Sequence, residues 1–196
     1  MSTVATAAGA EARPVPTLAA RRPRRADAAR NFDALLDAGR EAFAVDGPGA
    51  SLEDIARRAG VGIGTLYRNF ATRDDLIETI YLGEIEQLIR AAHDVAGGEP
   101  WPALRAWLDR FIDYVGTKHV LLAGLNGAST VFADCRASMM AAGAPLLERA
   151  QQAGLVKPEL SIGDVVKLVS AVTAVVVDDD AQRQRLIDLA IGSIRA

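Results

Sequence analysis

The stretch from Ser51 to Phe70, SLEDIARRAGVGIGTLYRNF, constrains the fold more than any other part of the chain. Its apolar residues recur every three or four positions on both sides of a glycine-containing corner, and this spacing predicts two short α-helices. Ser51, with Asp54 three residues later, has the form of a capping box that begins the first helix, and Gly60 ends that helix. Two short helices joined by three or four residues describe a helix-turn-helix.

Helical periodicity continues on both sides of this corner. It predicts one helix over about 26–45. It also predicts a long helix that begins at a second capping box, Thr72 with Asp75, and ends before the sequence GGEP at 97–100. We therefore predict an all-α fold. Further helices are expected from 101 to 154, and over about 162–177 and 181–195.

Composition limits where the chain works and what it does. No segment approaches the roughly 20 uncharged apolar residues that a membrane helix needs, and the N-terminus lacks the apolar core of a secretion signal. We therefore predict a cytoplasmic protein without a membrane contact. The single cysteine, Cys135, fits a reducing compartment. Two histidines, one cysteine and scattered acids form no catalytic motif, so we predict neither an enzyme nor a metal or cofactor site.

The charge is distributed unevenly. The net charge is −3, but the first thirty residues contain six arginines against two acidic residues, whereas residues 81–196 carry 11 basic and 14 acidic residues. An N-terminal excess of positive charge suits contact with phosphate. The run RRPRR at 21–25 is therefore either a solvated tail or a DNA-binding arm. Residues 1–20, rich in alanine, proline and threonine, are predicted to be a disordered tail.

The second helix of the corner has side chains that suit a helix in the DNA major groove. Thr65, Tyr67 and Arg68 face away from its apolar side and offer two hydroxyls and a guanidinium to phosphates and base edges. Gly62 and Gly64 lack side chains, so the backbone can approach the duplex closely. Any small helical protein can contain such a corner, which leaves a protein-interaction module whose helix-turn-helix no longer binds DNA as the alternative.

The sequence SLEDIARRAGVGIGTLYRNFATRDDLIETIY resembles the DNA-binding motif of the tetracycline-repressor (TetR) family in its phrases IA..AGV and GTLY..F and in the acid-leucine pair after the next cap. The resemblance covers about residues 24–81. It implies that Thr65 and Tyr67 bind phosphates, and that Arg73 stands where the family usually has a phosphate-binding lysine. Two departures are Gly62 and Ile63, where many members carry polar residues, and Asn69, which replaces a common histidine.

The predicted DNA-binding residues combine this resemblance with the helix pattern. The resemblance implies that Ser51 and Leu52, at the start of the first helix of the corner, seat that helix on the DNA backbone. Few side chains are then left for direct base readout, which leaves the operator sequence open. The full set is Arg24, Arg25, Ser51, Leu52, Gly62, Ile63, Thr65, Tyr67, Arg68 and Arg73.

Beyond residue 98 the chain is similar to the family only in outline. The segment PWPALRAWLDRFIDYVG predicts a helix with a broad apolar stripe, and a helical sensor domain needs such segments. Aromatic and methionine side chains there suit an apolar pocket, with Asp113 or His119 as polar anchors. Ordinary core packing is the alternative for each of them. The predicted ligand-binding residues are Trp107, Phe111, Tyr114, Phe132, Met139 and Met140.

The last two predicted helices, over about 162–177 and 181–195, are so apolar that they leave a face for a partner. In the TetR family two such helices pair with their symmetry mates in a four-helix bundle, which implies a homodimer. Three consecutive aspartates, Asp178–Asp180, are expected to cap the last helix rather than to bind a metal, because their side chains fan around the helix start.

The sequence thus predicts an N-terminal three-helix DNA-binding domain with a helix-turn-helix at 21–72, followed by a helical ligand-binding and dimerisation domain at 73–196. The predicted function is ligand-responsive transcription regulation. The protein is expected to bind a roughly palindromic double-stranded DNA operator as a homodimer and to repress. A small, largely apolar effector of unknown identity is expected to release it from the operator.

Overall fold

Helices form most of the part of the chain that the computed structural model describes, which is residues 17–123 and 131–196. At positions 119, 120, 122 and 131–134 only the backbone is described. No strand occurs within these ranges. The elements are α1 (Leu18–Arg21), α2 (Ala26–Asp46), the 3-10 helix η1 (Gly47–Gly49), α3 (Leu52–Arg58), α4 (Ile63–Asn69), α5 (Arg73–Val95), α6 (Pro100–Ala123), α7 (Val131–Gln152), α8 (Ile162–Thr173) and α9 (Asp180–Ser193).

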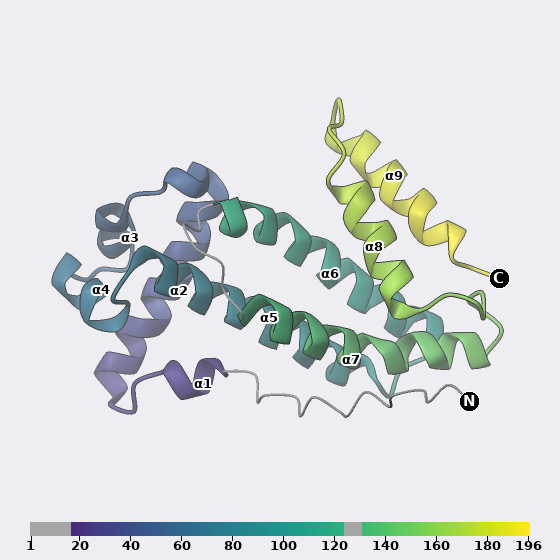
Figure 1. Ribbon diagram of the computed structural model, residues 1–196, viewed down its shortest axis with the longest axis horizontal. Coiled ribbons are helices and arrows are strands. Elements are labelled where there is room, and N and C mark those ends of the chain that lie inside the picture. The colour runs from purple at the N-terminus through teal and green to yellow at the C-terminus, as the bar shows by residue number, and fades with distance from the viewer. Residues whose placement is uncertain (1–16, 124–130) are drawn as a thin grey trace, which may run out of the picture.

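The helices form three groups, and the third, α8 with α9, stands beside the body rather than beyond its end (Figure 1). Helices α2, α3 and α4 gather at one end, which we call the reading head. Helices α5, α6 and α7 pack against one another and form the body, and the α8–α9 hairpin packs on α6 and α7. One continuous apolar core runs through the head and the body. None of the described helices is long and apolar enough to cross a lipid bilayer.

Side-chain caps begin the helices at the positions that the sequence predicts. The Thr72 hydroxyl accepts a hydrogen bond from the backbone N–H of Asp75 at 3.1 Å and begins α5. At α8 the capping box is complete, because Ser161 and Asp164 each accept a backbone N–H of the other, at 3.2 and 3.0 Å. The aspartate triplet also acts as a cap, since Asp179 accepts the Gln182 N–H at 2.6 Å.

Two predicted boundaries are wrong. Helix α8 ends at Thr173 rather than near 177, and the three β-branched residues at 175–177 lie in the turn to α9, where Val176 is 96% exposed. Residues 18–20, which we assigned to a disordered tail, belong to α1 instead. Leu18 packs against the core, and its backbone N–H donates to the Glu86 carboxylate at 2.6 Å. This attachment to a residue 68 positions away orders the segment.

Candidate DNA interface

The corner between α3 and α4 is a helix-turn-helix. Gly60 has φ +70°, in the left-handed region that glycine adopts without a steric penalty, and this conformation ends α3 and turns the chain into α4. Ile55 of α3 and Leu66 of α4 are fully buried in the core that both helices share with α2. The helices pack so that the opposite face of α4 is left on the surface of the reading head.

The outer face of α4 presents the polar residues predicted for DNA contact. Tyr67 is 49% exposed, and its hydroxyl forms no hydrogen bond within the described part of the chain. Arg68 is exposed, and its guanidinium donates to the Thr65 hydroxyl at 2.8 Å. Ile63 is also exposed at the start of the helix, together with the Gly62 cap. The structure therefore brings a phenol, a guanidinium and a hydroxyl to one exposed surface.

The start of α3 lies on the same reading head. The Ser51 hydroxyl accepts the Asp54 N–H at 3.3 Å and donates to the Glu53 carboxylate at 3.0 Å. The reciprocal half of the predicted capping box is not formed among the described hydrogen bonds, because the Asp54 carboxylate accepts from Arg57 at 2.6 Å instead. That hydrogen bond holds the pKa of Asp54 below its usual value. Leu52 is half-buried and seats the helix on the core.

The arginine run before α2 divides into two pairs. Arg21 and Arg22 form ion pairs with Asp75 and Asp33, at 2.8 and 2.5 Å. Arg24 and Arg25 are exposed, and neither forms an ion pair within the residues that the structure describes. The second pair is therefore available to a DNA phosphate, whereas the first is held by carboxylates of the same chain.

Arg73 is turned toward its own chain. Its guanidinium donates to the carbonyl of Ala50 at 2.7 Å and to the carbonyl of Pro48, and it stands 5.1 Å from the centre of the Phe43 ring. These contacts hold the connection between α2 and α3 against the start of α5. The predicted phosphate contact of Arg73 stays a prediction, and it would use the N–H groups that these two carbonyls leave over.

The predicted ligand-binding residues lie in the body of the protein, mostly in its core. Trp107, Phe111, Tyr114 and Met139 are buried, and Met140 is half-buried. The Phe132 and His119 side chains lie outside the described residues. The predicted anchor Asp113 does not face the core, because it is exposed at the surface beside Arg110, at 3.6 Å.

An aromatic row links α6 to α5. The Trp107 and Phe111 rings stack with their centres 5.9 Å apart, Phe111 and Tyr114 follow at 5.8 Å, and the Tyr114 hydroxyl is hydrogen-bonded to that of Tyr81 at 2.8 Å. The Trp107 indole N–H donates to the carbonyl of Leu88 at 3.2 Å. Burial raises the pKa of both tyrosines. We did not predict from the sequence that Tyr81 belongs to this row. The only signal was its place in an apolar helix, one residue after Ile80.

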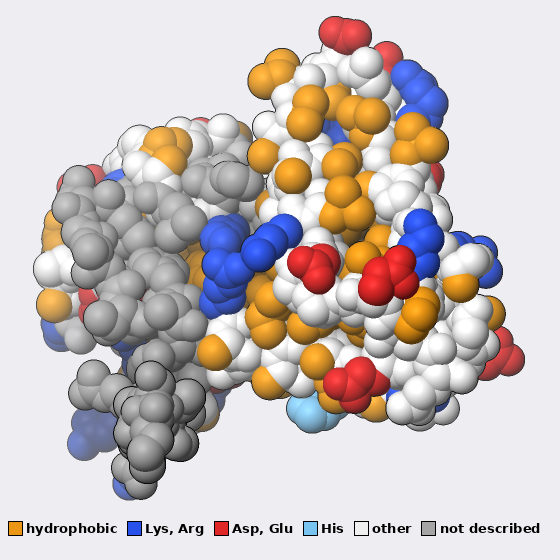
Figure 2. Space-filling model, turned by 45° about the vertical axis from the view of Figure 1, so that its right-hand side comes forward, with side chains coloured by type: hydrophobic (Ala, Val, Ile, Leu, Met, Phe, Trp, Pro, Cys, Tyr) orange, Lys and Arg blue, Asp and Glu red, His pale blue; other side chains and the backbone are white. Residues whose placement is uncertain are grey.

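The α8–α9 hairpin keeps apolar side chains on its outer surface. Val165 and Ile187 are buried, but Val175 and Leu189 are 49% and 69% exposed. Figure 2 shows hydrophobic side chains running along the lobe that the hairpin forms. A helical hairpin with apolar residues on both faces is typical of a helix-bundle interface between subunits.

A helix-turn-helix at one end of a helical body defines a DNA-binding regulator, and comparison with known proteins gives its family. Residues 35–80 match the family model of bacterial regulatory proteins of the tetR family, and residues 99–196 match the C-terminal domain of SbtR-like transcriptional regulators. The chain belongs to the TetR family of transcriptional regulators.

Solved structures agree with this assignment. A TetR transcriptional regulator of Streptomyces coelicolor is 36% identical over 84% of this chain and 98% of its own, with a TM-score of 0.70. A TetR transcription regulatory protein of Mycobacterium vanbaalenii is 27% identical over 89% of this chain and 100% of its own, also with a TM-score of 0.70. A ketosteroid transcriptional regulator of Mycobacterium tuberculosis is 17% identical over 84% and 95%, with a TM-score of 0.55, which shows a shared fold alone.

Proposed function

We propose that this regulator is a homodimeric repressor, with its DNA-binding domain at 21–72 and its effector and dimerisation domain at 73–196. It is released from a roughly palindromic operator by a small, largely apolar effector, and it acts in the cytoplasm without catalysis. The observation that carries this proposal is the outer face of α4, where Tyr67 and Arg68 are exposed and Arg68 is hydrogen-bonded to the half-buried Thr65.

DNA binding is supported by the size and chemistry of α4. An α-helix with its side chains is about 10–12 Å across, which fits a major groove of about 12 Å width, and the seven residues of α4 extend about 10 Å along that groove. Tyr67 and Thr65 donate to phosphates, and Arg68 reaches a phosphate or a base edge. Arg24 and Arg25 extend the contact along the DNA backbone, since both are exposed and outside any described ion pair.

Dimerisation is supported by the α8–α9 hairpin, whose outer side chains include Val176 and Leu189. One reading head alone contacts few phosphates, whereas two heads related by a twofold axis bind two half-sites of a palindrome. Half-site centres then lie one helical turn or more apart, and one turn is about 34–36 Å.

The effector response is supported by α5, which extends from the reading head into the body. Its 23 residues span about 34 Å, and its middle turns carry the contacts of Tyr81 and Leu88 to the aromatic row of α6. A small apolar molecule that inserts beside this row moves α5 and changes the spacing of the two heads. One fold relative is a ketosteroid regulator, but its likeness shows the fold alone, so the effector class rests on the apolar body of this chain.

Selection of duplexes from a random pool, followed by titration of the recovered duplex, tests DNA binding. Tyr67→Phe should weaken binding about tenfold or more, because a hydrogen bond to a charged group contributes about 1.5–3 kcal/mol. Tyr114→Phe is the matched control, since it removes the same hydroxyl from the core of the body, and it should bind DNA like the unchanged chain. Equal losses in both variants, or no selected duplex, would contradict the proposal and favour the protein-interaction module.

Leu189→Arg tests the dimer. A charge placed on the outer face of α9 should shift sedimentation toward the monomer and reduce affinity for the selected duplex by at least tenfold. Gln184→Arg is the control, because it adds the same charge at an exposed position of the same helix whose side chain is already polar. A monomeric Leu189→Arg chain that binds the full palindrome at unchanged affinity would refute the role of dimerisation.

A thermal-shift screen of small apolar compounds, with and without the selected duplex, tests the effector. A compound that lowers DNA affinity tenfold must itself bind tenfold more weakly to the DNA complex, which corresponds to about 1.4 kcal/mol of coupling. A compound that binds equally to the free and DNA-bound protein cannot be the inducer.

A further inference from the structure

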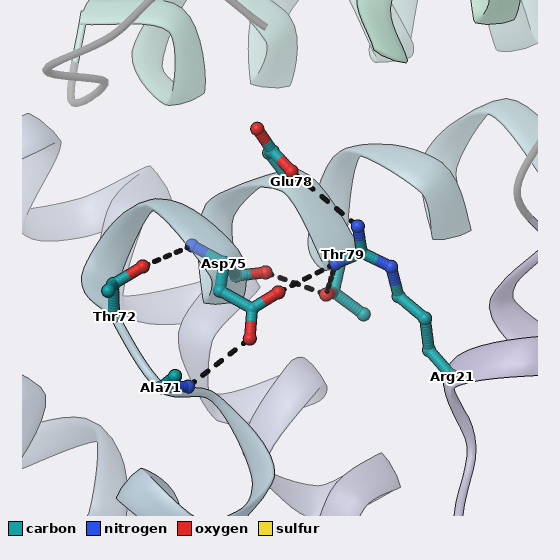
Figure 3. Close-up of polar contacts among 6 residues, drawn as sticks. All are labelled: Arg21, Ala71, Thr72, Asp75, Glu78 and Thr79. Atoms are coloured by element: carbon teal, nitrogen blue, oxygen red, sulfur yellow. Dashed lines mark hydrogen bonds and ion pairs between the residues drawn. The ribbon is translucent and has the colours of Figure 1, made fainter.

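Helix α1 lies along α5 rather than on the reading head that it precedes in sequence. The Arg21 guanidinium donates to the Asp75 carboxylate and to the Thr79 hydroxyl, both at 2.8 Å, and its second nitrogen lies 3.5 Å from the Glu78 carboxylate (Figure 3). About two turns further along α5, the Leu18 N–H binds Glu86 at 2.6 Å. These contacts follow α5 from residue 75 to 86, about 16 Å of its length.

The acceptors of Arg21 are themselves fixed. The second Asp75 oxygen accepts the N–H of Ala71 at 3.2 Å, in the turn between α4 and α5, and the Thr79 hydroxyl donates to the Asp75 carbonyl at 2.6 Å. Figure 3 shows Arg21 reaching across to this group from α1. Arg21 therefore connects the segment before α2 to the turn that follows the exposed helix α4.

Arg24 and Arg25 follow directly after this connection. Arg24 is three residues beyond Arg21, so its Cα lies at most about 11 Å from that of Arg21. Pro23 between them has a fixed φ, which further limits the path of the chain. A fixed Arg21 therefore limits the positions that Arg24 and Arg25 reach relative to α4.

We infer that Arg21 is a positioning residue for DNA binding: it holds the segment 18–25, which we call the arm, on α5, so that Arg24 and Arg25 meet the DNA backbone at a set distance from α4. This inference rests on the proposed DNA-binding function. Arg21 itself does not contact DNA, because carboxylates and a hydroxyl of the same chain occupy its guanidinium. Its effect on affinity passes through the two following arginines.

The first measurement is DNA affinity for the duplex recovered by selection, with the full-length chain. Arg21→Gln should weaken binding at least tenfold, and Arg21→Lys should restore part of the loss, because an ammonium keeps a single contact with Asp75 or Glu78. Arg30→Gln is the matched control. It removes the same charge from the N-terminal region, but its ion pair with Asp27 lies within α2 and does not involve α5.

The second measurement separates positioning from direct phosphate contact. In a chain that already carries Arg24→Gln and Arg25→Gln, adding Arg21→Gln should cost less than twofold, because the side chains that Arg21 positions are gone. If Arg21 bound a phosphate itself, the loss of DNA affinity from Arg21→Gln would multiply with the loss from the other two changes. Arg21→Gln would then still lower the affinity tenfold in this background. A remaining tenfold cost, or no effect of Arg24→Gln with Arg25→Gln, overturns the inference.

The third measurement needs no DNA. Amide hydrogen exchange of the free protein should rise at Leu18 and Arg22 in Arg21→Gln and stay unchanged in Arg30→Gln, because the Leu18 N–H is protected by Glu86 and the Arg22 N–H by the Leu18 carbonyl. Unchanged exchange in Arg21→Gln refutes the attachment of the arm. A chain that selects no duplex refutes the proposed function. A chain that binds DNA, but in which the affinity losses from Arg21→Gln and from the Arg24 and Arg25 changes multiply, refutes only the role of Arg21.

Discussion

Replacement of Gly143 by alanine should destabilise the body, because the α7 backbone lies directly against the Trp107 ring. An added Cβ would stand 2.4, 2.6 and 2.8 Å from three carbons of the indole. Carbon atoms in contact lie about 3.5–4.0 Å apart, so the ring or the helix must move by about 1 Å. The indole is held by its hydrogen bond to Leu88 and by stacking on Phe111, and it has little freedom to move away.

The magnitude follows from two opposing effects. Overpacking of a filled core costs about 1–3 kcal/mol, and three approaches below 3 Å to a held ring place this site near the upper limit. Alanine gains up to about 1 kcal/mol over glycine within a helix, so the net loss should be about 2 kcal/mol. Gly116→Ala is the control, because Gly116 is exposed on α6 with no atom within 4 Å of the added Cβ, and it should stabilise by about 0.5–1 kcal/mol.

Urea unfolding followed by circular dichroism measures both changes. Trp107→Phe provides a further check, since phenylalanine lacks the outer part of the indole ring, and Gly143→Ala should cost less in that background than in the unchanged chain. A Gly143→Ala chain as stable as the unchanged chain would show that α7 and Trp107 are not in contact.

Three further results follow from the turn at Gly60, the cap of α8 and the exposed arginines of the arm. Gly60→Ala should lower the free energy of unfolding by about 1–2 kcal/mol in urea unfolding, because alanine is strained at φ +70°. The hydroxyl and backbone N–H that donate to Asp164 hold its pKa below the usual value. The unchanged chain should therefore have a higher free energy of unfolding than Asp164→Asn at pH values above the unfolded-state pKa of Asp164, and this difference should be lost as the pH falls through the folded-state pKa. Urea titrations at several pH values measure the difference. Arg24→Gln with Arg25→Gln should flatten the slope of log affinity against log salt by about 0.9 for each phosphate that is no longer neutralised, whereas Arg185→Gln on α9 should leave it unchanged.

The reading head was predictable because its signals are local in sequence. The Thr72 cap acts three residues away, and the left-handed turn at Gly60 depends on that residue alone. The same holds for the start of α8, where Ser161 and Asp164 bond each other. Caps of this kind need no knowledge of the tertiary fold, so the helix order and most boundaries follow from them together with the apolar period.

The parts that the sequence did not predict depend on contacts between distant residues. Helix α1 has four residues, too few for a stable helix in isolation, and it is held by acceptors 54 to 68 positions away on α5. The resemblance to the family predicts a phosphate contact for Arg73, but its carbonyl partners Pro48 and Ala50 become visible only when the turn before α3 is folded. A pattern of residue types indicates which face of a helix is buried, not which partner meets it.

Helix α5 contacts the arm and the reading head as well as the aromatic row of the body, and the order of these contacts along the helix bears on the proposed response to an effector. The stretch of α5 from Asp75 to Glu86 holds the arm at both of its ends, and between them buried Glu84 holds the reading head by pairing with Arg40 of α2 at 2.5 Å. The aromatic row meets α5 at the Tyr81 hydroxyl, within this stretch, and at the carbonyl of Leu88, just after it. A displacement of α5 by an effector therefore carries α2 and the arm together, because both are tied to the same stretch of the helix. The arm would then leave the DNA backbone in step with α4, so that both groups of phosphate contacts contribute to the difference in affinity on which release depends.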